Sequence, residues 1–166
     1  MRKQKGFSLI ELLIVVAIIL IIAAIAIPNL LRARIAANES AAASGIRTIN
    51  TGEVSYNSTY PTVGYSAALV DLGPGGPTAA CPAPPTQTAS CEIDGVLAGG
   101  VKQGYTYTYN NVTGTPAVTY SIENNPTQLN QSGVRSFCSF EDAVVRFQPS
   151  GGGLAACDGT VAVLGQ

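Results

Sequence analysis

The strongest constraint on this chain is an unbroken run of sixteen apolar residues, Leu12 to Ile27. Extended to Phe7 and Leu31, the run has four interruptions: Ser8, Glu11, Pro28 and Asn29. A helix rises about 1.5 Å per residue, so residues 7–31 would form a helix of roughly 37 Å, longer than the bilayer's hydrocarbon core of about 30 Å. The sequence therefore predicts that this segment spans a membrane.

The charges that flank the run predict its orientation. Arg2, Lys3 and Lys5 precede it with no acidic residue among them. The positive-inside rule then keeps the N-terminus cytoplasmic, a bias that Arg32 and Arg34 weaken without reversing. Hydropathy by itself fits a simple signal anchor equally well, although the apolar part continues into helix-compatible sequence, unlike a cleaved secretory signal.

Glu11 argues against a simple anchor. A carboxylate inside a spanning helix costs on the order of 2.5 to 3.5 kcal/mol and normally has a partner. No Lys or Arg follows Glu11 within a helical turn. Cleavage after Gly6 would make the α-amino group of Phe7 a cation four residues away. That amine can meet Glu11 of a neighbouring subunit, in a stagger that sets axial register.

This N-terminal segment resembles the prepilin signature of type IV pilins and type II secretion pseudopilins. The resemblance rests on the basic leader, Gly6, Phe7 and the run FSLIELLIVVAIILIIAAIAIPNLL, and it covers roughly the first forty residues. It implies a class III signal peptide cleaved between Gly6 and Phe7 by a membrane aspartyl peptidase, N-methylation of Phe7, and a requirement for Glu11 in assembly. Pro28 matches the family's helix proline, around which the helix can loosen in a filament. Taken alone, Pro28 is a kink that membrane helices tolerate.

Residues 32–57 are expected to continue the helix as an amphipathic half that packs on a globular head. Larger apolar residues recur at multiples near 3.5, with Ala42 between them: Leu31, Ile35, Ile46, Ile49, Tyr56 and Tyr60. The opposite face carries Asn38, Ser40, Arg47, Asn50 and Ser55. Gly45 and Gly52 each weaken a helix interior by about 1 kcal/mol relative to alanine. They either allow close packing or mark a bend or an end of the helix.

The remaining sequence predicts a loop followed by a small sheet. Residues 58–104 are rich in Pro, Gly, Ala and Thr, which indicates a long connection held by a short element near 67–72 or by a disulfide. Strand patterns follow at residues 105–109, 117–122, 134–140 and 143–147, with another candidate at 161–164. Asn110, Asn111 and Gly114 predict the first hairpin turn. The expected fold is α+β: a long N-terminal helix packed on an antiparallel sheet, as in pilins.

Four cysteines, Cys81, Cys91, Cys138 and Cys157, lie in the distal part of the chain without C-x-x-C spacing. An even number behind an export signal indicates two disulfides in an oxidising compartment, and the spacing disfavours zinc. The most local of three pairings joins Cys81 to Cys91 and Cys138 to Cys157. The resemblance implies that the second pair bounds a C-terminal region exposed on the filament.

Composition argues against catalysis and nucleic-acid binding. The chain has no histidine, and only 11% of its residues are charged, with no basic face. The seven tyrosines are expected to serve core packing and strand formation. Glu141, Asp142 and Asp158 are expected in solvated turns, because no calcium motif surrounds them. No metal or cofactor is predicted.

The sequence thus predicts a structural subunit of a type IV pilus that self-associates into a helical filament and is not an enzyme. The alternative is a pseudopilin of a type II secretion system. The expected segments are a leader (1–6), a membrane-spanning half-helix (7–31), an amphipathic half-helix (32–57), a loop (58–104) and a sheet with a disulfide-bounded region (105–166). The resemblance implies two partners, a prepilin peptidase/methyltransferase and an inner-membrane assembly platform. It places the chain in the bacterial inner membrane before assembly, and in an extracellular pilus or periplasmic pseudopilus afterwards.

Overall fold

A computed structural model describes residues 7–149, 157 and 160–165 of the 166-residue chain. The predicted leader, with Gly6, and Asp158 lie outside the described residues. The chain forms two compact units, Met1–Arg34 and Ile35–Gln166.

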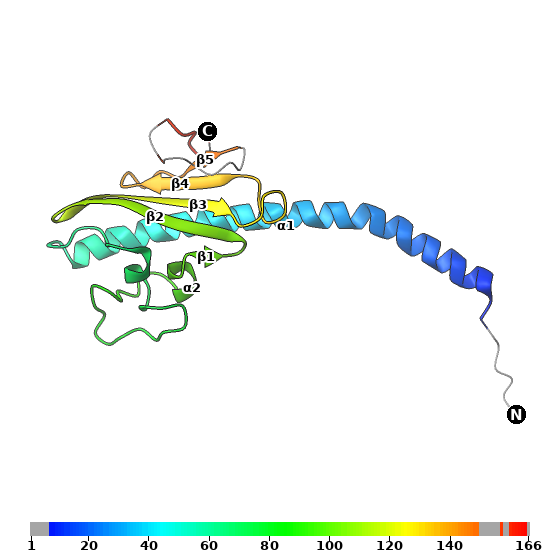
Figure 1. The fold of residues 1–166 in the computed structure, drawn as a ribbon, viewed down its shortest axis with the longest axis horizontal. Coiled ribbons are helices and arrows are strands. Elements are labelled where there is room, and N and C mark those ends of the chain that lie inside the picture. The colour runs from blue at the N-terminus through cyan, green and yellow to red at the C-terminus, as the bar shows by residue number, and fades with distance from the viewer. Residues whose placement is uncertain (1–6, 150–156, 158–159, 166) are drawn as a thin grey trace, which may run out of the picture. The chain divides into compact units, whose positions relative to one another are not determined.

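One helix, α1 (Leu9–Thr59), runs through both units and contains Pro28 (Figure 1). It ends two residues beyond the predicted boundary at residue 57. By length and composition its N-terminal part is apolar enough to cross a membrane. The large apolar side chains of that part are exposed, from 43% at Leu31 to 78% at Leu9. Such a surface is suited to lipid or to other helices rather than to water.

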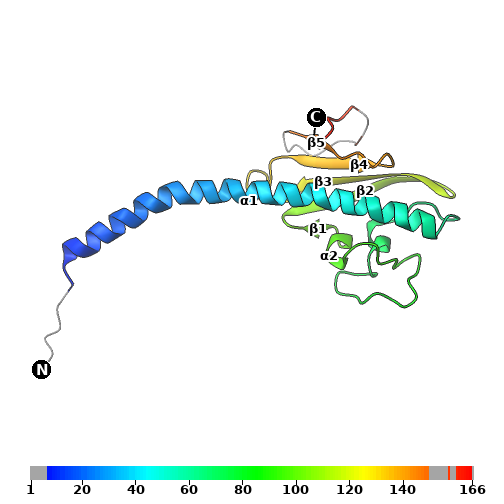
Figure 2. The same ribbon diagram turned by 180° about the vertical axis from the view of Figure 1, so that it is seen from behind.

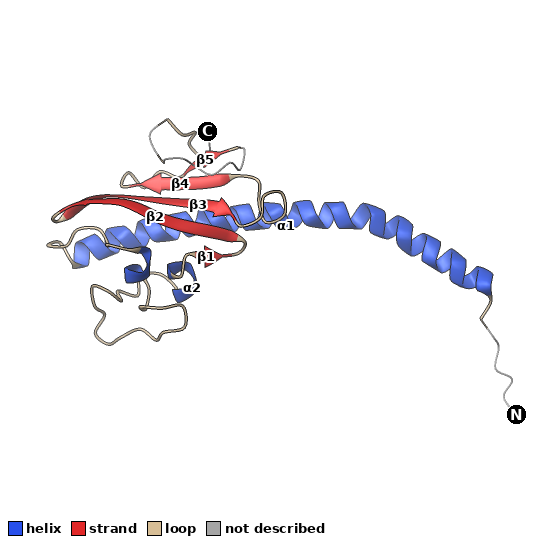
Figure 3. Cartoon of the chain, viewed as in Figure 1, coloured by secondary structure: helices blue, strands red, loops and turns tan. Residues whose placement is uncertain are grey.

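The second unit contains a five-stranded antiparallel sheet in the order β1-β2-β3-β4-β5 (Figure 3). Its strands are β1 (Val101–Lys102), β2 (Tyr105–Gly114), β3 (Ala117–Pro126), β4 (Ser136–Phe140) and β5 (Arg146–Gln148). Within this unit, the second half of α1 lies along one face of the sheet (Figure 2). The predicted α+β, pilin-like fold class is therefore confirmed.

The hairpin between β2 and β3 turns at residues 115–116, later than predicted. Asn110 pairs with Ser121 inside the ladder, so the prediction that Asn110 and Asn111 form the turn was wrong. Gly114 adopts a φ of 100°, which glycine reaches without steric cost. The chain therefore reverses after the glycine rather than at the asparagines, and β2 grows to ten residues.

The segment 58–104 is more structured than the sequence suggested. It contains a 3₁₀ helix, η1 (Leu69–Leu72), near the predicted position, but also the short helix α2 (Gly95–Ala98) and strand β1, which were not predicted. Leu72 and Leu97 are almost completely buried. These two leucines anchor the segment to the core. They are too far apart in the sequence to show the spacing that predicts a helix or a strand.

The last strands are shorter than their sequence patterns. β4 begins at Ser136 instead of residue 134, and β5 begins at Arg146 instead of residue 143. The candidate strand at 161–164 contributes a single bridge, between Val163 and Arg146.

The core of the second unit lies between α1 and the sheet. Its buried members are Ala42, Ala43, Ile46, Ile49, Tyr56, Leu69, Leu72, Ile93, Leu97, Ala98, Tyr105, Tyr107, Tyr120, Ile122, Phe137 and Val145. Four of the seven tyrosines are among them. Tyr120 also meets the rings of Tyr65 and Tyr109, with centroids 4.7 and 5.9 Å away. The core-packing interpretation of these tyrosines is confirmed.

Gly45 allows close packing between α1 and β2. The Tyr107 hydroxyl donates to the carbonyl oxygen of Ala42 at 3.4 Å, and a Cβ at position 45 would overlap that hydroxyl. At Gly52, a Cβ would lie 3.1 Å from a methyl carbon of Ile93. Since α1 continues to Thr59, neither glycine ends the helix.

We expect Gly45→Ala to destabilise the second unit by about 1 to 3 kcal/mol, because the new methyl group overpacks the contact with Tyr107. Intrinsic helix propensity predicts the opposite, a gain of about 1 kcal/mol. Guanidinium unfolding of the full chain in detergent measures the difference. The neighbouring exposed variant Ser44→Ala is the control and should be nearly neutral; a Gly45→Ala chain that is more stable than wild type would contradict the packing role.

Candidate functional site

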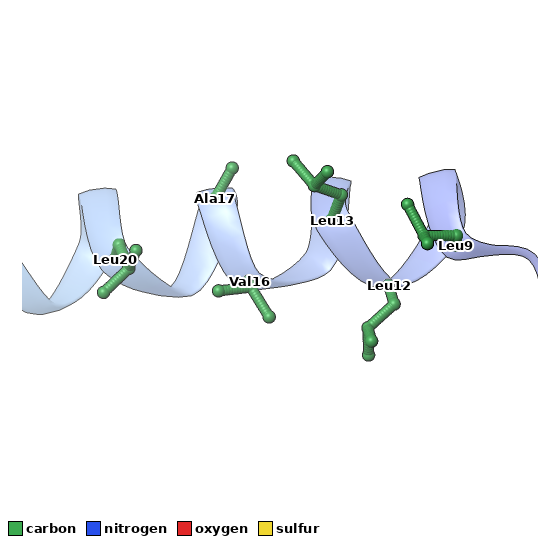
Figure 4. A pocket seen from close by; sticks show the side chains of 6 residues that line it. All are labelled: Leu9, Leu12, Leu13, Val16, Ala17 and Leu20. Carbon is green, nitrogen blue, oxygen red and sulfur yellow. The ribbon is translucent and has the colours of Figure 1, made fainter.

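The first half of α1 presents an exposed, largely apolar surface. A shallow groove of about 330 Å³ along α1 is lined only by Leu9, Leu12, Leu13, Val16, Ala17 and Leu20 (Figure 4). The six side chains point away from the helix axis and none carries a polar atom. In water such a surface is unfavourable, so it requires lipid or an apolar helix of another molecule.

Glu11 is the one acidic residue of this unit and lies in the first turn of α1. A carboxylate near a helix N-terminus is favoured by the helix dipole. Within the described residues, Glu11 forms no hydrogen bond or ion pair through its side chain. Phe7 precedes the helix and is 76% exposed. The predicted partner of Glu11, the amine of Phe7, would belong to another subunit, and that pairing stays a prediction.

Pro28 lies inside α1, and the helix is continuous on both sides of it. A proline removes one hydrogen bond from the helix ladder and its ring crowds the preceding turn. The predicted loosening at Pro28 would require a filament, so it also stays a prediction.

In the second unit, a buried carboxylate joins α1 to the start of β4. Glu39 is 6% exposed. One of its oxygens accepts the N–H groups of Val134 and Arg135 at 2.9 and 3.0 Å, and the other accepts the Arg135 Nε at 2.7 Å. Burial alone would raise the pKa of Glu39, but the two backbone hydrogen bonds and the guanidinium together hold it below its ordinary value. Glu39 therefore stays charged and holds Val134 and Arg135 against α1; these three contacts are called the Glu39 clamp.

Asn50 joins α1 to β3, to β4 and to the segment after β4. Its amide donates to the Ser139 hydroxyl at 2.9 Å and to the Ala143 carbonyl at 3.2 Å, and its oxygen accepts from the Tyr120 hydroxyl at 3.0 Å. Asn50 is only 4% exposed, so its assignment to the polar face of the helix was wrong. A polar side chain is tolerated in a core when each of its groups finds a partner.

A second buried carboxylate, Glu53, joins α1 to the loop and to β2. It is fully buried and accepts from the Ser66 N–H at 3.0 Å, the Ser66 hydroxyl at 2.5 Å and the Tyr109 hydroxyl at 2.6 Å. Burial raises the pKa of Glu53, and the hydrogen bonds from Ser66 and Tyr109 oppose that rise. Burial and the charge of Glu53 also raise the pKa of Tyr109.

Asn124 completes this polar framework. Its amide donates to the Ala42 carbonyl at 3.0 Å, and its oxygen accepts from the Phe137 N–H at 3.1 Å. Together with Glu39, Asn50 and Glu53, it attaches α1 to the sheet and to the segments next to the sheet. Sequence reasoning missed all four roles, because a polar residue on a helix or strand carries no sign that its partners lie 13 to 96 residues away.

The structure pairs Cys81 with Cys91 and Cys138 with Cys157, the most local arrangement. The Cα atoms are 6.0 and 5.8 Å apart, within the usual range for disulfides. The first bridge closes part of the loop, and the second ties Cys157 to β4.

One predicted solvated acid is an ion-pair partner. Asp142 lies in an exposed turn, as predicted, and it also accepts from the Arg146 guanidinium at 2.6 and 3.1 Å. Glu141 is exposed, as expected. Among the residues that the structure describes, no group of three or more His, Cys, Asp or Glu side chains could hold a metal ion.

Comparison with known proteins agrees with the apolar helix. Residues 1–27 match the family model for the prokaryotic N-terminal methylation motif. The chain is 46% identical over 76 residues to the type IV wide pilus major component of Thermus thermophilus, covering 44% of this chain and 56% of that protein. It is 45% identical over 54 residues to the type IV major pilin of Myxococcus xanthus, covering 32% and 24% of the two chains.

A third relative belongs to a secretion machine. The type II secretion system core protein G of Vibrio cholerae is 40% identical over 65 residues, which covers 37% of this chain and 44% of that protein. The chain thus spans about half or less of the length of the curated relatives it matches. No solved structure matches it significantly.

Proposed function

We propose that this chain is a structural subunit of a type IV pilus, because residues 1–27 match the prokaryotic N-terminal methylation motif and the chain is similar to pilus and pseudopilus components. The observation that carries the proposal is the first half of α1, an exposed apolar surface interrupted by a single carboxylate, Glu11. Lipid can cover that surface before assembly, and the helices of other subunits can cover it afterwards.

In this proposal the leader is cleaved after Gly6 by a prepilin peptidase, which also methylates the new N-terminal Phe7. The helix is stored in the bacterial inner membrane with its N-terminus cytoplasmic, and an inner-membrane platform extracts it. The amine of Phe7 then pairs with Glu11 of a neighbouring subunit. A charge pair in an apolar surrounding has few alternative partners, so it selects one axial register. Pro28 provides the point at which the helix loosens in the filament.

The pilus is favoured over the pseudopilus because two of the three relatives are pilus components, with higher identities than the secretion protein. The two disulfides agree with an oxidising location, which the cell surface and the periplasm both provide. The role is structural rather than enzymatic: in the described part of the second unit, the buried polar groups hold α1 to the sheet.

Mass spectrometry of extracellular filaments sheared from the native host tests this function. We expect the chain in the sheared fraction, beginning with a methylated Phe7 and with all four cysteines oxidised. Processed chain that stays in the cell envelope would instead support a periplasmic pseudopilin. An intact Met1 would contradict both and indicate a plain membrane anchor.

A further inference from the structure

A polar pocket lies on the second unit between α1 and β4. It has a volume of about 220 Å³ and is lined by Ala36, Glu39, Ser40, Ala43, Arg47, Arg135, Phe137 and Leu164. Two guanidinium groups and one carboxylate border it, so the pocket carries a formal charge of +1. Its chemistry suits an anionic group that accepts hydrogen bonds from arginine.

Arg135 is held in position on one side of this pocket. Its Nε donates to Glu39, and its guanidinium carbon lies 5.6 and 5.8 Å from the ring centres of Phe137 and Phe147. Within the described residues, its two terminal nitrogens make no hydrogen bond. An arginine that is already fixed loses little side-chain entropy when it binds a carboxylate.

Arg47, on α1, is the basic residue of the second unit that forms no ion pair with the described residues. Three of this unit's four basic side chains form ion pairs: Lys102 with Asp94, Arg135 with Glu39, and Arg146 with Asp142. Arg47 is exposed and has no acidic partner within the described residues.

Among the described acidic residues of this unit, Glu141 corresponds to Arg47, because it too is exposed and forms no ion pair. Of the acidic residues that the structure describes in this unit, only Glu141 is both exposed and outside an ion pair. Glu92 is unpaired but half-buried. Glu141 follows β4 directly, whereas Arg135 directly precedes that strand, so the two lie at opposite ends of it.

We propose that the Arg47–Arg135 pocket of one copy binds the Glu141 carboxylate of a second copy of this chain. The two surfaces differ, because Arg135 directly precedes β4 and Glu141 directly follows it. From residue 135 to residue 141 an extended chain covers roughly 20 Å, at about 3.3 Å per residue. A contact between two different surfaces repeats head to tail, and it builds an open filament when successive rotations do not close into a ring.

This inference rests on the proposed function and adds the specific contact between heads. Charge reversal in the full chain, expressed in the native host, tests it. Arg47→Glu and Glu141→Arg should each lower the yield of sheared filaments about tenfold or more, because each places like charges in the contact. The double variant, Arg47→Glu with Glu141→Arg, should restore the yield to near the wild-type level.

Two controls separate this contact from general charge effects. Arg47→Glu combined with Glu92→Arg has the same net charge as the restored double variant and should stay defective. Cysteines at positions 47 and 141 together should give a ladder of oligomers in filaments treated with a short bismaleimide, whereas either cysteine alone should not. All four native cysteines are in disulfides and will not react.

The outcomes distinguish the two proposals. Normal filament yield from wild type and from Arg47→Glu would overturn the head contact alone. Rescue by Glu92→Arg, or failure of Glu141→Arg to rescue, would also overturn it. Absence of the wild-type chain from the sheared fraction would overturn the proposed pilus function, and this inference with it.

Discussion

Replacing Glu11 by alanine is expected to lower the filament yield roughly 100-fold, while membrane insertion and leader cleavage stay largely intact. An unpaired carboxylate in a spanning helix costs on the order of 2.5 to 3.5 kcal/mol. If pairing with the amine of Phe7 relieves that cost, the variant loses a preference of similar size, which is about two powers of ten in an equilibrium. Insertion itself is not impaired, because the helix becomes more apolar. The measurement compares the sheared fraction with total processed chain by immunoblotting.

Two variants identify which property of Glu11 matters. Glu11→Gln keeps the size and hydrogen-bonding oxygen but removes the charge, so it should fail almost as completely as alanine. Ser8→Ala removes another polar side chain of the same segment and should assemble normally. Wild-type amounts of filament from Glu11→Gln would refute charge pairing and leave Glu11 a steric or hydrogen-bonding role.

Removing the Glu39 clamp is expected to have the largest effect on the stability of the second unit. In Glu39→Ala, the N–H groups of Val134 and Arg135 lose their acceptor and the Arg135 guanidinium loses its partner. Unsatisfied donors in a partly buried site, together with a broken ion pair, correspond to about 3 kcal/mol of unfolding free energy. Guanidinium unfolding of the full chain in detergent would measure the loss.

Graded variants make the Glu39 prediction specific. Glu39→Gln keeps an oxygen for the two backbone N–H groups but loses the attraction to Arg135, so it should cost about 1 kcal/mol. The adjacent Ser40 is exposed and makes no side-chain hydrogen bond within the described residues, so Ser40→Ala should be neutral. Equal stability of Glu39→Ala and Ser40→Ala would show that the clamp is unimportant.

The pH dependence gives an independent check on Glu39. Its pKa is lower in the folded chain than its ordinary value of 4.5. Stability from the clamp is therefore fully present above about pH 5 and is lost as the pH falls through the lowered pKa. Unfolding midpoints of wild type should decline more steeply on acidification than those of Glu39→Gln. Parallel curves would contradict the shift.

The fold class was predictable because its signals are local. The apolar run from Leu12 to Ile27, the spacing of Ile46, Ile49 and Tyr56, and the alternation in Tyr105–Tyr109 are each patterns of apolar side chains within one element. Turn positions and short elements were less predictable. The hairpin turn moved beyond Asn110, and α2 and β1 arose where a loop was expected, because tertiary packing of a few leucines outweighed local composition.

The N-terminal site was also evident without a structure. Glu11 is conspicuous because a charge within an apolar run is costly, so its presence there indicates a functional role. The polar contacts of the second unit had no comparable signal. Arg47 and Glu141 look like ordinary surface residues until the ion pairs of the other basic side chains are known.

The order of apolar and polar side chains along the chain was enough to predict an apolar half-helix, an amphipathic half, alternating strands and a lone carboxylate. Each follows from the water affinity and spacing of neighbouring side chains. The tertiary structure alone decided which polar groups are satisfied, since Glu39, Asn50 and Glu53 find partners between 13 and 96 residues away. Hydrogen bonds and ion pairs depend on direction and distance in space, so only the folded chain shows which charges are used and which stay available for a neighbour.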